Sequence, residues 1–301
     1  MSNIQIISDG ALDLSPELCK EKDIRVVPFY VSFDGEHYYK EIEEIGIRDF
    51  YQRMVDDPKT FPKSSLPAIQ DYYDVFEEYA KQNIPMICIC ITRKFSGSQE
   101  AALNARTMIL EEYPDAKIEV IDSIQDTVLQ GLYVQEACRA RDLGWDFDRI
   151  VARLLEIREA GRIFFTVGSI DYLAHGGRIG KLASLAGGAL KIQPLITLRE
   201  GEIFPSGITR NRKKAMQKVV DMTAAYLDEV KAKPGEYAFC IGYGYDMEEP
   251  KVFREMLADM IRTRLGIDEI PLYQIGATIS VHTGPYPLGV SIVKRADYDA
   301  Q

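Results

Sequence analysis

The sequence predicts an α/β protein of two domains: an N-terminal three-layer α/β/α domain with a mainly parallel sheet, and a C-terminal α/β domain with a mixed sheet. Three observations lead to this prediction. The chain has 301 residues, more than one typical domain of ~100–200 residues. Strand-like and helical patterns alternate through the first half, which is typical of a doubly wound sheet. In the second half, two short apolar runs flank the turn Glu200-Gly201, which favours a hairpin.

The elements of the first half follow from hydrophobic spacing. Met86–Thr92 is nearly all apolar, as expected of a strand buried on both faces, and Ser15-Pro16-Glu17 is a helix start with an N-cap and a proline at the first helical position. The other predicted strands are Ile4–Ser8, Arg25–Phe33 and Lys117–Ile121. The predicted helices are Ile47–Val55, Ala68–Gln82, Gly97–Glu112, Thr127–Leu143 and Phe147–Ala160.

The second half predicts a different unit, and we place the boundary between domains 1–161 and 162–301. Ile170–Ala189 is a glycine-rich segment of small residues, and Ser280–Val290 is a turn-rich loop between two apolar runs. The predicted strands are Arg162–Val167, Leu195–Leu198, Ile203–Ile208, Tyr237–Tyr243, Ile270–Ile275 and Gly289–Lys294, and the helices are Lys213–Val230 and Pro250–Leu265.

Composition and charge exclude several classes of protein. Hydrophobic residues make up 46% and charged residues 27%, which is ordinary globular usage and excludes a disordered or fibrous chain. The 36 basic and 46 acidic residues give a net charge of −10. Because nonspecific affinity for nucleic acids comes mostly from Lys and Arg on phosphates, we expect no nucleic-acid partner.

The location of the protein is predicted from what the sequence lacks. The longest apolar run, Met86–Ile91, is six residues, whereas a membrane-spanning helix needs ~20, so we expect at most transient contact with membranes. The N-terminus has no basic region followed by a long apolar stretch and does not predict a secretory signal. Five cysteines without a CxxC pair favour a reduced, cytoplasmic compartment. Three scattered histidines argue against a metal site, and no cofactor is expected.

The most informative segment is Thr92–Ala102, which follows the most apolar strand and opens a helix. Ligands of open α/β sheets bind beyond the carboxyl ends of the strands, and a helix start there favours an anion. Ser96 and Ser98 supply hydroxyl donors, although a plain N-cap explains them equally well. Ser64 and Ser65 stand before another helix, so two hydroxyl loops of one domain can converge on one carboxylate or phosphate.

Two further segments contain candidate site residues. Arg178 is flanked by glycines and is suited to an oxyanion; a structural arginine that fixes a loop is the alternative. The segment fails the phosphate-loop pattern, because His175 and Leu182 stand where that loop needs Gly and Ser or Thr. His282 lies in the turn-rich loop and either donates to an anion or satisfies a carbonyl.

A hydrolase is the competing hypothesis. Ser96 would be the nucleophile and His282 its base, in a serine hydrolase or acyltransferase. The glycines of a nucleophile elbow are missing around Ser96, so the pattern favours this activity only weakly.

Taken in order, five motifs resemble those of the DegV family of bacterial fatty-acid-binding proteins. Ser8-Asp9-Gly-Ala-Leu-Asp13-Leu14 is similar to the family's opening Asp-Ser-x-x-Asp-Leu, and Ser96-Gly97-Ser98-Gln99 to its Ser-Gly-Thr-Tyr. The remaining three are Lys63-Ser64-Ser65-Leu66-Pro67, Gly177-Arg178-Ile179-Gly180-Lys181 and His282-Thr283-Gly284-Pro285. The resemblance covers essentially the whole chain. Ser64 and Ser98 stand where the family has threonine, Leu66 where it has glutamine, and Gln99 where it has tyrosine.

The resemblance implies a carrier and no catalytic activity of its own. A long-chain fatty acid would lie in an interdomain tunnel, its carboxylate bound by Ser64, Ser65, Ser96, Ser98 and His282. Arg178 would sit at the mouth and contact the acyl phosphate or a partner. That partner would be an ATP-dependent fatty acid kinase, which forms the acyl phosphate on the presented carboxylate.

Overall fold

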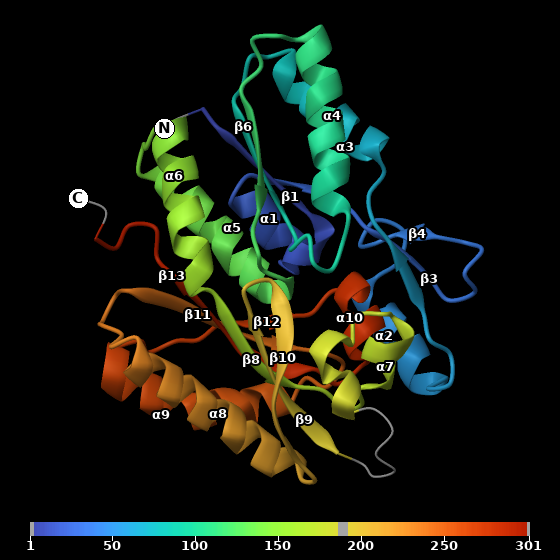
Figure 1. Cartoon of the computed structure of the whole chain (residues 1–301), viewed down its shortest axis with the longest axis vertical. Coiled ribbons are helices and arrows are strands. Elements are labelled where there is room, and N and C mark those ends of the chain that lie inside the picture. The colour runs from blue at the N-terminus through green and yellow to red at the C-terminus, as the bar shows by residue number, and fades with distance from the viewer. Residues whose placement is uncertain (1–2, 186–191, 300–301) are drawn as a thin grey trace.

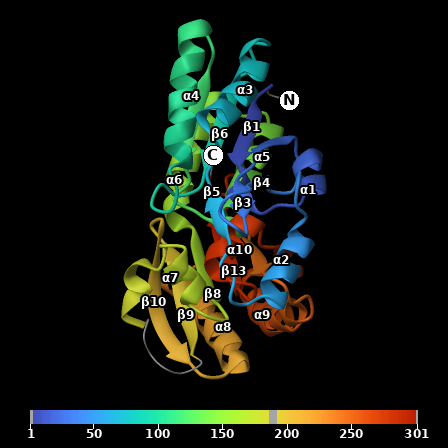
Figure 2. The ribbon, with the colours of Figure 1, turned by 90° about the vertical axis from the view of Figure 1, so that its right-hand side faces the viewer.

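A computed structural model describes residues 3–185 and 192–299 of the chain. Its two halves lie one above the other along the long axis, with β1, β6, α3 and α4 at one end and β9, β10, α8 and α9 at the other (Figures 1 and 2). Within the described ranges, no helix is long and apolar enough to cross a membrane.

The first half contains the predicted parallel sheet. Its strands β1 (Gln5–Asp9), β2 (Ile24–Val27), β6 (Met86–Cys90) and β7 (Ile118–Asp122) are ordered β2-β1-β6-β7, all parallel. The connecting elements are η1 (Gly10–Leu12), α1 (Pro16–Glu21), α3 (Ile69–Ala80), α4 (Ser98–Glu112) and α5 (Thr127–Asp142). The carboxyl ends of β1, β6 and β7 therefore share one edge of the sheet, which faces the second half.

One predicted strand is divided in the structure. Arg25–Phe33 was expected to be continuous, but Pro28 separates β2 from β3 (Tyr30–Ser32), because proline has no N–H for a ladder. β3 joins a small antiparallel sheet, β4-β3-β5, with β4 at Tyr39–Lys40 and β5 at Lys63–Ser65. α2 (Ile47–Asp56) lies between β4 and β5 in the chain. The predicted hydroxyl loop at Ser64 is thus an edge strand.

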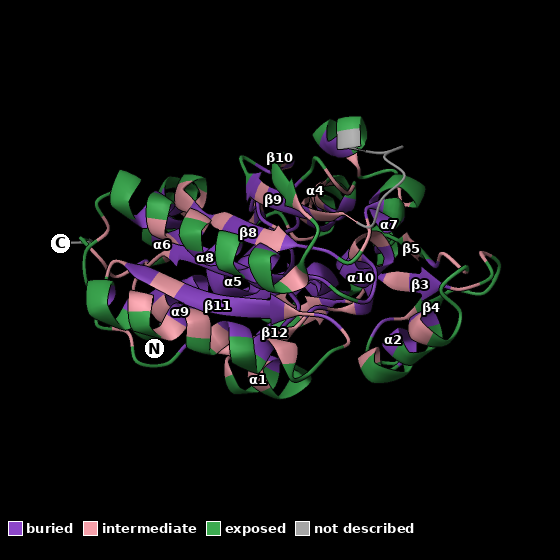
Figure 3. Ribbon diagram, turned by 90° about the horizontal axis from the view of Figure 1, so that it is seen from below, coloured by how far each residue is buried: buried purple, intermediate pink, exposed green. Residues whose placement is uncertain are grey.

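The second half forms the predicted mixed sheet, ordered β10-β9-β8-β13-β11-β12. The strands are β8 (Arg162–Thr166), β9 (Gln193–Arg199), β10 (Glu202–Thr209), β11 (Tyr237–Tyr243), β12 (Leu272–Gln274) and β13 (Leu288–Lys294). Only the β11–β12 pair is parallel. Glu200 and Gly201 have φ of 54° and 76°, the left-handed conformation that a tight hairpin turn needs, so the predicted hairpin is confirmed. The helices α8 (Arg212–Glu229) and α9 (Glu249–Leu265) pack on one face of the sheet (Figure 3).

Helix α5 connects the two sheets through a shared core. Thirteen of its sixteen residues are buried, as expected of a helix covered on all sides. It contacts β1 and η1 of the first half and β11 and β13 of the second. Figure 3 shows it in the buried interior. The α5 residues Val128 and Leu132 belong to one hydrophobic cluster with Ile6 of β1 and Val293 of β13.

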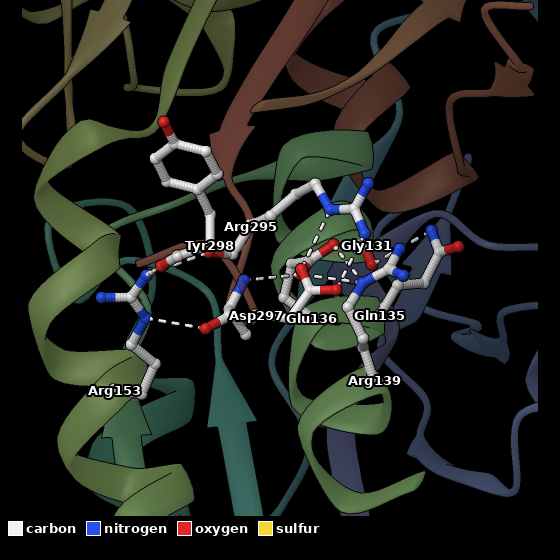
Figure 4. Close-up of polar contacts among 9 residues, drawn as sticks. Gly131, Gln135, Glu136, Arg139, Arg153, Arg295, Asp297 and Tyr298 are labelled. Atoms are coloured by element: carbon white, nitrogen blue, oxygen red, sulfur yellow. Dashed lines mark hydrogen bonds and ion pairs between the residues drawn. The ribbon is translucent and has the colours of Figure 1, made fainter. Parts of the chain in front are cut away.

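The C-terminal segment fastens the second half to helices α5 and α6 (Phe147–Ile157; Figure 4). The Glu136 carboxylate accepts from the backbone N–H of Ala296 at 2.8 Å and from Arg139 Nε at 3.1 Å. Arg153 donates to the carbonyls of Ala296 and Arg295 at 2.9 and 3.2 Å, and to that of Tyr298. These hydrogen bonds hold the junction between the halves. The chain passes into the second half through η2 (Arg158–Ala160), which directly follows α6.

Two segments contain helices that the sequence analysis did not predict. The small-residue segment Ile170–Ala189 contains α7 (Asp171–His175) and η3 (Gly180–Leu185), and its residues 186–189 lie outside the described ranges. The predicted loop Ser280–Val290 begins inside a short helix, α10 (Ala277–Thr283), and ends inside β13, so only residues 284–287 lie outside a helix or strand. Ala277–Val281 are all buried, so α10 has no polar face whose period a sequence search could detect.

Candidate functional site

A large cavity lies where the two halves meet, at the edge to which β1, β6 and β7 point. It encloses about 830 Å³ of space between the side chains, part of it open to solvent. We call it the outer cavity. The candidate residues Ser64, Ser65, Ser96, Arg178 and His282 line it, together with Phe29, Leu66, Ile91, Phe95, Phe165 and Leu173.

Ser64 and His282 form the polar centre of the outer cavity. Ser64 is held by β5, where it pairs with Val31 of β3, and its Oγ lies 3.2 Å from His282 Nε2 on α10. Burial, and then the charge of Arg178, lower the pKa of His282 to about 4. The imidazole is therefore neutral near pH 7 and has one N–H to donate. Within the described ranges, its buried Nδ1 has no hydrogen-bond partner.

Ser96 lies in the loop between β6 and α4, and this loop is held from both sides. The backbone N–H of Ser98 donates to Ser96 Oγ at 3.2 Å, which leaves the hydroxyl hydrogen of Ser96 for a ligand. From the second half, Arg178 donates to the carbonyl of Phe95 through Nε at 3.1 Å and Nη2 at 3.0 Å. Arg178 thus contacts the backbone next to Ser96 while its side chain borders the cavity.

Ser98 does not line the outer cavity with the other predicted residues. Its side chain is fully buried behind the loop, because the first turn of α4 packs against the parallel sheet. Its hydroxyl donates to Asp9 Oδ2 at 2.7 Å and lies 2.6 Å from the Tyr72 hydroxyl. Ser98 therefore lies behind Ser96, which it contacts through its backbone N–H, and does not reach the outer cavity.

A second, inner cavity of about 400 Å³, open space at its edge included, lies beside the outer one. The two share Asp126, Phe165, Ile279 and Thr283 in their walls, and we call this shared region the waist. The inner cavity lies between α5 and the six-stranded sheet, and its lining includes Val128, Ile163, Leu198, Ile275 and Leu288. Gly289 also lines it; an added Cβ there would lie 2.4 Å from Phe165 Cβ, so this strand position has room only for glycine.

Sequence reasoning missed several cavity residues. Thr278 and Thr283 were missed because α10 was not predicted, and Thr278 is fixed by hydrogen bonds from its N–H and hydroxyl to buried Glu41 at 3.3 and 2.6 Å. Asp126 could have been found from its position in the sequence. It follows β7 and therefore lies at the same sheet edge as Ser96, where ligands of such sheets bind.

The arrangement differs from the one a serine hydrolase requires. His282 Nε2 faces Ser64 at 3.2 Å, and in the described part of the chain no hydrogen bond joins His282 to Ser96. No carboxylate orients His282, because its Nδ1 is unpartnered there and faces Gly176. The described residues also contain no group of three or more side chains suited to a metal ion.

The fold and the cavities together define a two-part α/β protein with two adjacent, mostly apolar cavities, the outer of which contains serine hydroxyls and a neutral imidazole. The model of the uncharacterised DegV family COG1307 matches residues 3–295. A DegV domain-containing protein of Clostridium perfringens is 30% identical over 293 residues, 97% of this chain and 99% of that protein. The chain therefore belongs to the DegV family.

Two solved structures share the whole fold. One is a stearic acid-binding protein from Eubacterium ventriosum, 43% identical, with a TM-score of 0.92 over 98% of this chain and 99% of that chain. The other is a fatty acid-binding DegV family protein from Thermus thermophilus, 26% identical, with a TM-score of 0.84 over 97% of this chain and 99% of that chain. The predicted family and fold class are thus confirmed.

Proposed function

We propose that this protein binds one long-chain fatty acid, with the tail in the inner cavity and the carboxylate at Ser64, Ser96 and His282, and presents it to a kinase. The observation that carries the proposal is the Ser64–His282 pair in the outer of two adjacent, mostly apolar cavities that share part of their walls. The fatty acid-binding relatives with the same fold support it. We propose residues 1–161 as the domain of the hydroxyl groups and 162–301 as the domain that encloses the chain.

The energetics suit such a ligand. Each buried methylene contributes ~0.8 kcal/mol, so a tail that fills the inner cavity compensates for the entropy lost on ordering the chain. A carboxylate removed from water needs several hydrogen-bond donors. Ser64, Ser65 and Ser96 offer hydroxyls, and the neutral His282 offers one N–H. Ser98 contributes by fixing Ser96.

The mouth of the outer cavity is suited to a phosphate-transferring partner. Lys94, Arg178 and Lys181 are exposed there and border one small depression. Both lysines lie near Glu202, at 3.6 and 2.6 Å, so the four residues together remain positive. We propose that this rim receives the kinase or the phosphate of the acyl phosphate, while the protein itself carries out no chemistry.

Binding is tested by native mass spectrometry of the purified protein before and after delipidation, followed by titration with stearate. We expect a co-purified acid and its replacement by stearate in a 1:1 complex. The double substitution Ser64→Ala and Ser96→Ala should weaken binding by about 100-fold, at ~1–3 kcal/mol for each lost hydrogen bond to a charged group. Ser206→Ala, on an exposed strand position away from both cavities, is the matched control. Absence of any acyl ligand and of stearate uptake would disprove the proposal.

Presentation is tested separately with an ATP-dependent fatty acid kinase. We expect phosphorylation of the bound acid only when this protein, the kinase and ATP are all present. A serine-directed fluorophosphonate probe should not label Ser96. Labelling that disappears in Ser96→Ala would favour the hydrolase hypothesis.

A further inference from the structure

Asp126 is an unusual residue for the wall of a fatty-acid cavity. It borders both cavities at the waist, next to Phe165, Ile279 and Thr283. A single acyl chain that occupied both cavities would therefore lie against the Asp126 side chain. This contact between Asp126 and an acyl chain rests on the proposed function.

The carboxyl group of Asp126 is not used by the fold in the ordinary way. Asp126 is the N-cap of α5, where an aspartate side chain normally accepts a hydrogen bond from the first turn, but no such capping bond is formed. Its Oδ1 is buried and has no partner within the described ranges. Further in, the buried Ser291 also lines the inner cavity, and its hydroxyl lies beside Cys240 on the neighbouring strand β11.

A saturated tail would leave Asp126 Oδ1 without a hydrogen-bond partner. When a chain fills the cavity, water leaves the waist, and a buried polar group without a hydrogen bond costs free energy. Methylene groups offer neither a donor nor an acceptor. A ligand with an oxygen atom at this depth would satisfy the carboxyl group and would lose nothing along the apolar walls.

The protonation of Asp126 fits a hydroxyl or keto partner. Burial raises its pKa to about 7, a hydrogen bond from the backbone of Thr127 opposes the rise, and the charge of buried Asp9 on β1 adds to it. The other ionisable groups around the outer cavity are His282 on α10 and exposed Arg178. Near neutral pH the Asp126 carboxyl is thus available both as a donor and as an acceptor.

We propose that Asp126 is a specificity-determining residue, and that the acyl chain which fits these cavities best carries a hydroxyl or keto oxygen partway along its length. The chemical class is an oxygenated long-chain fatty acid.

The test compares stearate with its mono-hydroxylated forms, substituted at successive positions from carbon 8 to carbon 14, on the delipidated protein at pH 6.5 by isothermal titration calorimetry. We expect at least one hydroxystearate to bind about tenfold more tightly than stearate, the effect of satisfying one buried polar group. Asp126→Leu should abolish this preference and bind stearate at least as well as the wild type. Asp126→Asn, which keeps a donor and an acceptor, should retain a preference.

The outcomes separate this inference from the proposed function. The inference is wrong if stearate binds as tightly as every hydroxystearate, or if the preference survives in Asp126→Leu. In both cases the protein is still a fatty-acid carrier. A water molecule trapped at the waist would give the first of these results. If no acid binds, both the proposed function and the inference fail. Asp126→Ala is the second variant should the leucine prevent folding, with circular dichroism and stearate binding as the folding controls.

Discussion

Ser64 Oγ and His282 Nε2 lie 3.2 Å apart, although 218 positions separate the two residues in the chain. The contact joins the edge strand β5 of the first half to α10 in the second half. It therefore depends on the correct assembly of both halves. Burial, and then the charge of Arg178, lower the pKa of His282 to about 4. The stability of the folded protein therefore depends on pH through this imidazole.

We predict that His282→Gln weakens the pH dependence of stability. An unfolded histidine titrates near pH 6.5, so between about pH 6.5 and 4 the unfolded chain binds the proton that the folded protein excludes. Stability from this group is complete above pH 6.5 and is lost as the pH falls towards 4. The difference in unfolding free energy between pH 7.5 and 4.5 should shrink by about 1–3 kcal/mol in the variant. Urea denaturation at both pH values measures it.

The control for this prediction is His175→Gln, because His175 is exposed at the end of α7. It should leave the difference between the two pH values nearly unchanged. An unaltered pH dependence in His282→Gln would show that the imidazole titrates as freely in the folded protein as in the unfolded chain.

A second prediction concerns the glycine that faces His282. A Cβ added at Gly176 would lie 2.0 Å from His282 Nδ1, so Gly176→Ala must displace the imidazole from Ser64. We expect fatty-acid affinity to fall at least tenfold and the unfolding free energy to fall by about 1–3 kcal/mol. Stearate titration and urea denaturation test both effects. Gly46→Ala, where the nearest neighbour of a Cβ is Asp49 Oδ2 at 3.7 Å, should alter neither, and unchanged binding in Gly176→Ala would contradict the placement of His282.

A third prediction separates the two serines of one loop. Ser98 and Gln130 donate to buried Asp9, at 2.7 and 2.8 Å; burial raises the pKa of Asp9 and these hydrogen bonds lower it. Ser98→Ala should reduce stability by about 1–3 kcal/mol, because the buried Asp9 Oδ2 loses one of its two donors and keeps only the N–H of Ile91. Ser96→Ala should change stability by less than ~0.5 kcal/mol but weaken stearate binding about tenfold. Thermal denaturation and titration of both variants decide whether the roles are divided in this way.

These serines also show how far a sequence can predict a site. The order of strand, loop and helix located the hydroxyl groups at the ligand edge of the sheet, since that rule depends only on chain direction. It did not reveal that the first turn of α4 directs Ser98 towards Asp9. That choice depends on packing with α3 and β1, which are distant in the chain.

The same division holds for the fold. The hairpin at Glu200-Gly201 was predictable, because its turn residues carry the information locally. The edge strand β5 and the short helix α10 were not, since both exist through contacts with distant partners: β5 pairs with β3, and α10 is held by Glu41 through Thr278. The residues that these two elements bring together, Ser64 and His282, were nevertheless recognisable as candidates from their motifs.

The last prediction concerns Arg178, which is exposed at the cavity mouth and donates to the carbonyls of Phe95 and Gly176. Because its contacts are to backbone at the surface and not to a buried charge, Arg178→Ala should raise the dissociation constant for stearate less than about fivefold, a change of ~1 kcal/mol. Phosphorylation of the bound acid by a fatty acid kinase should fall more than tenfold, since the rim loses the cation that meets the phosphate. Arg262→Ala, an exposed arginine on α9, should affect neither reading. A loss of stearate binding as large as the loss of phosphorylation would instead make Arg178 part of the carboxylate site.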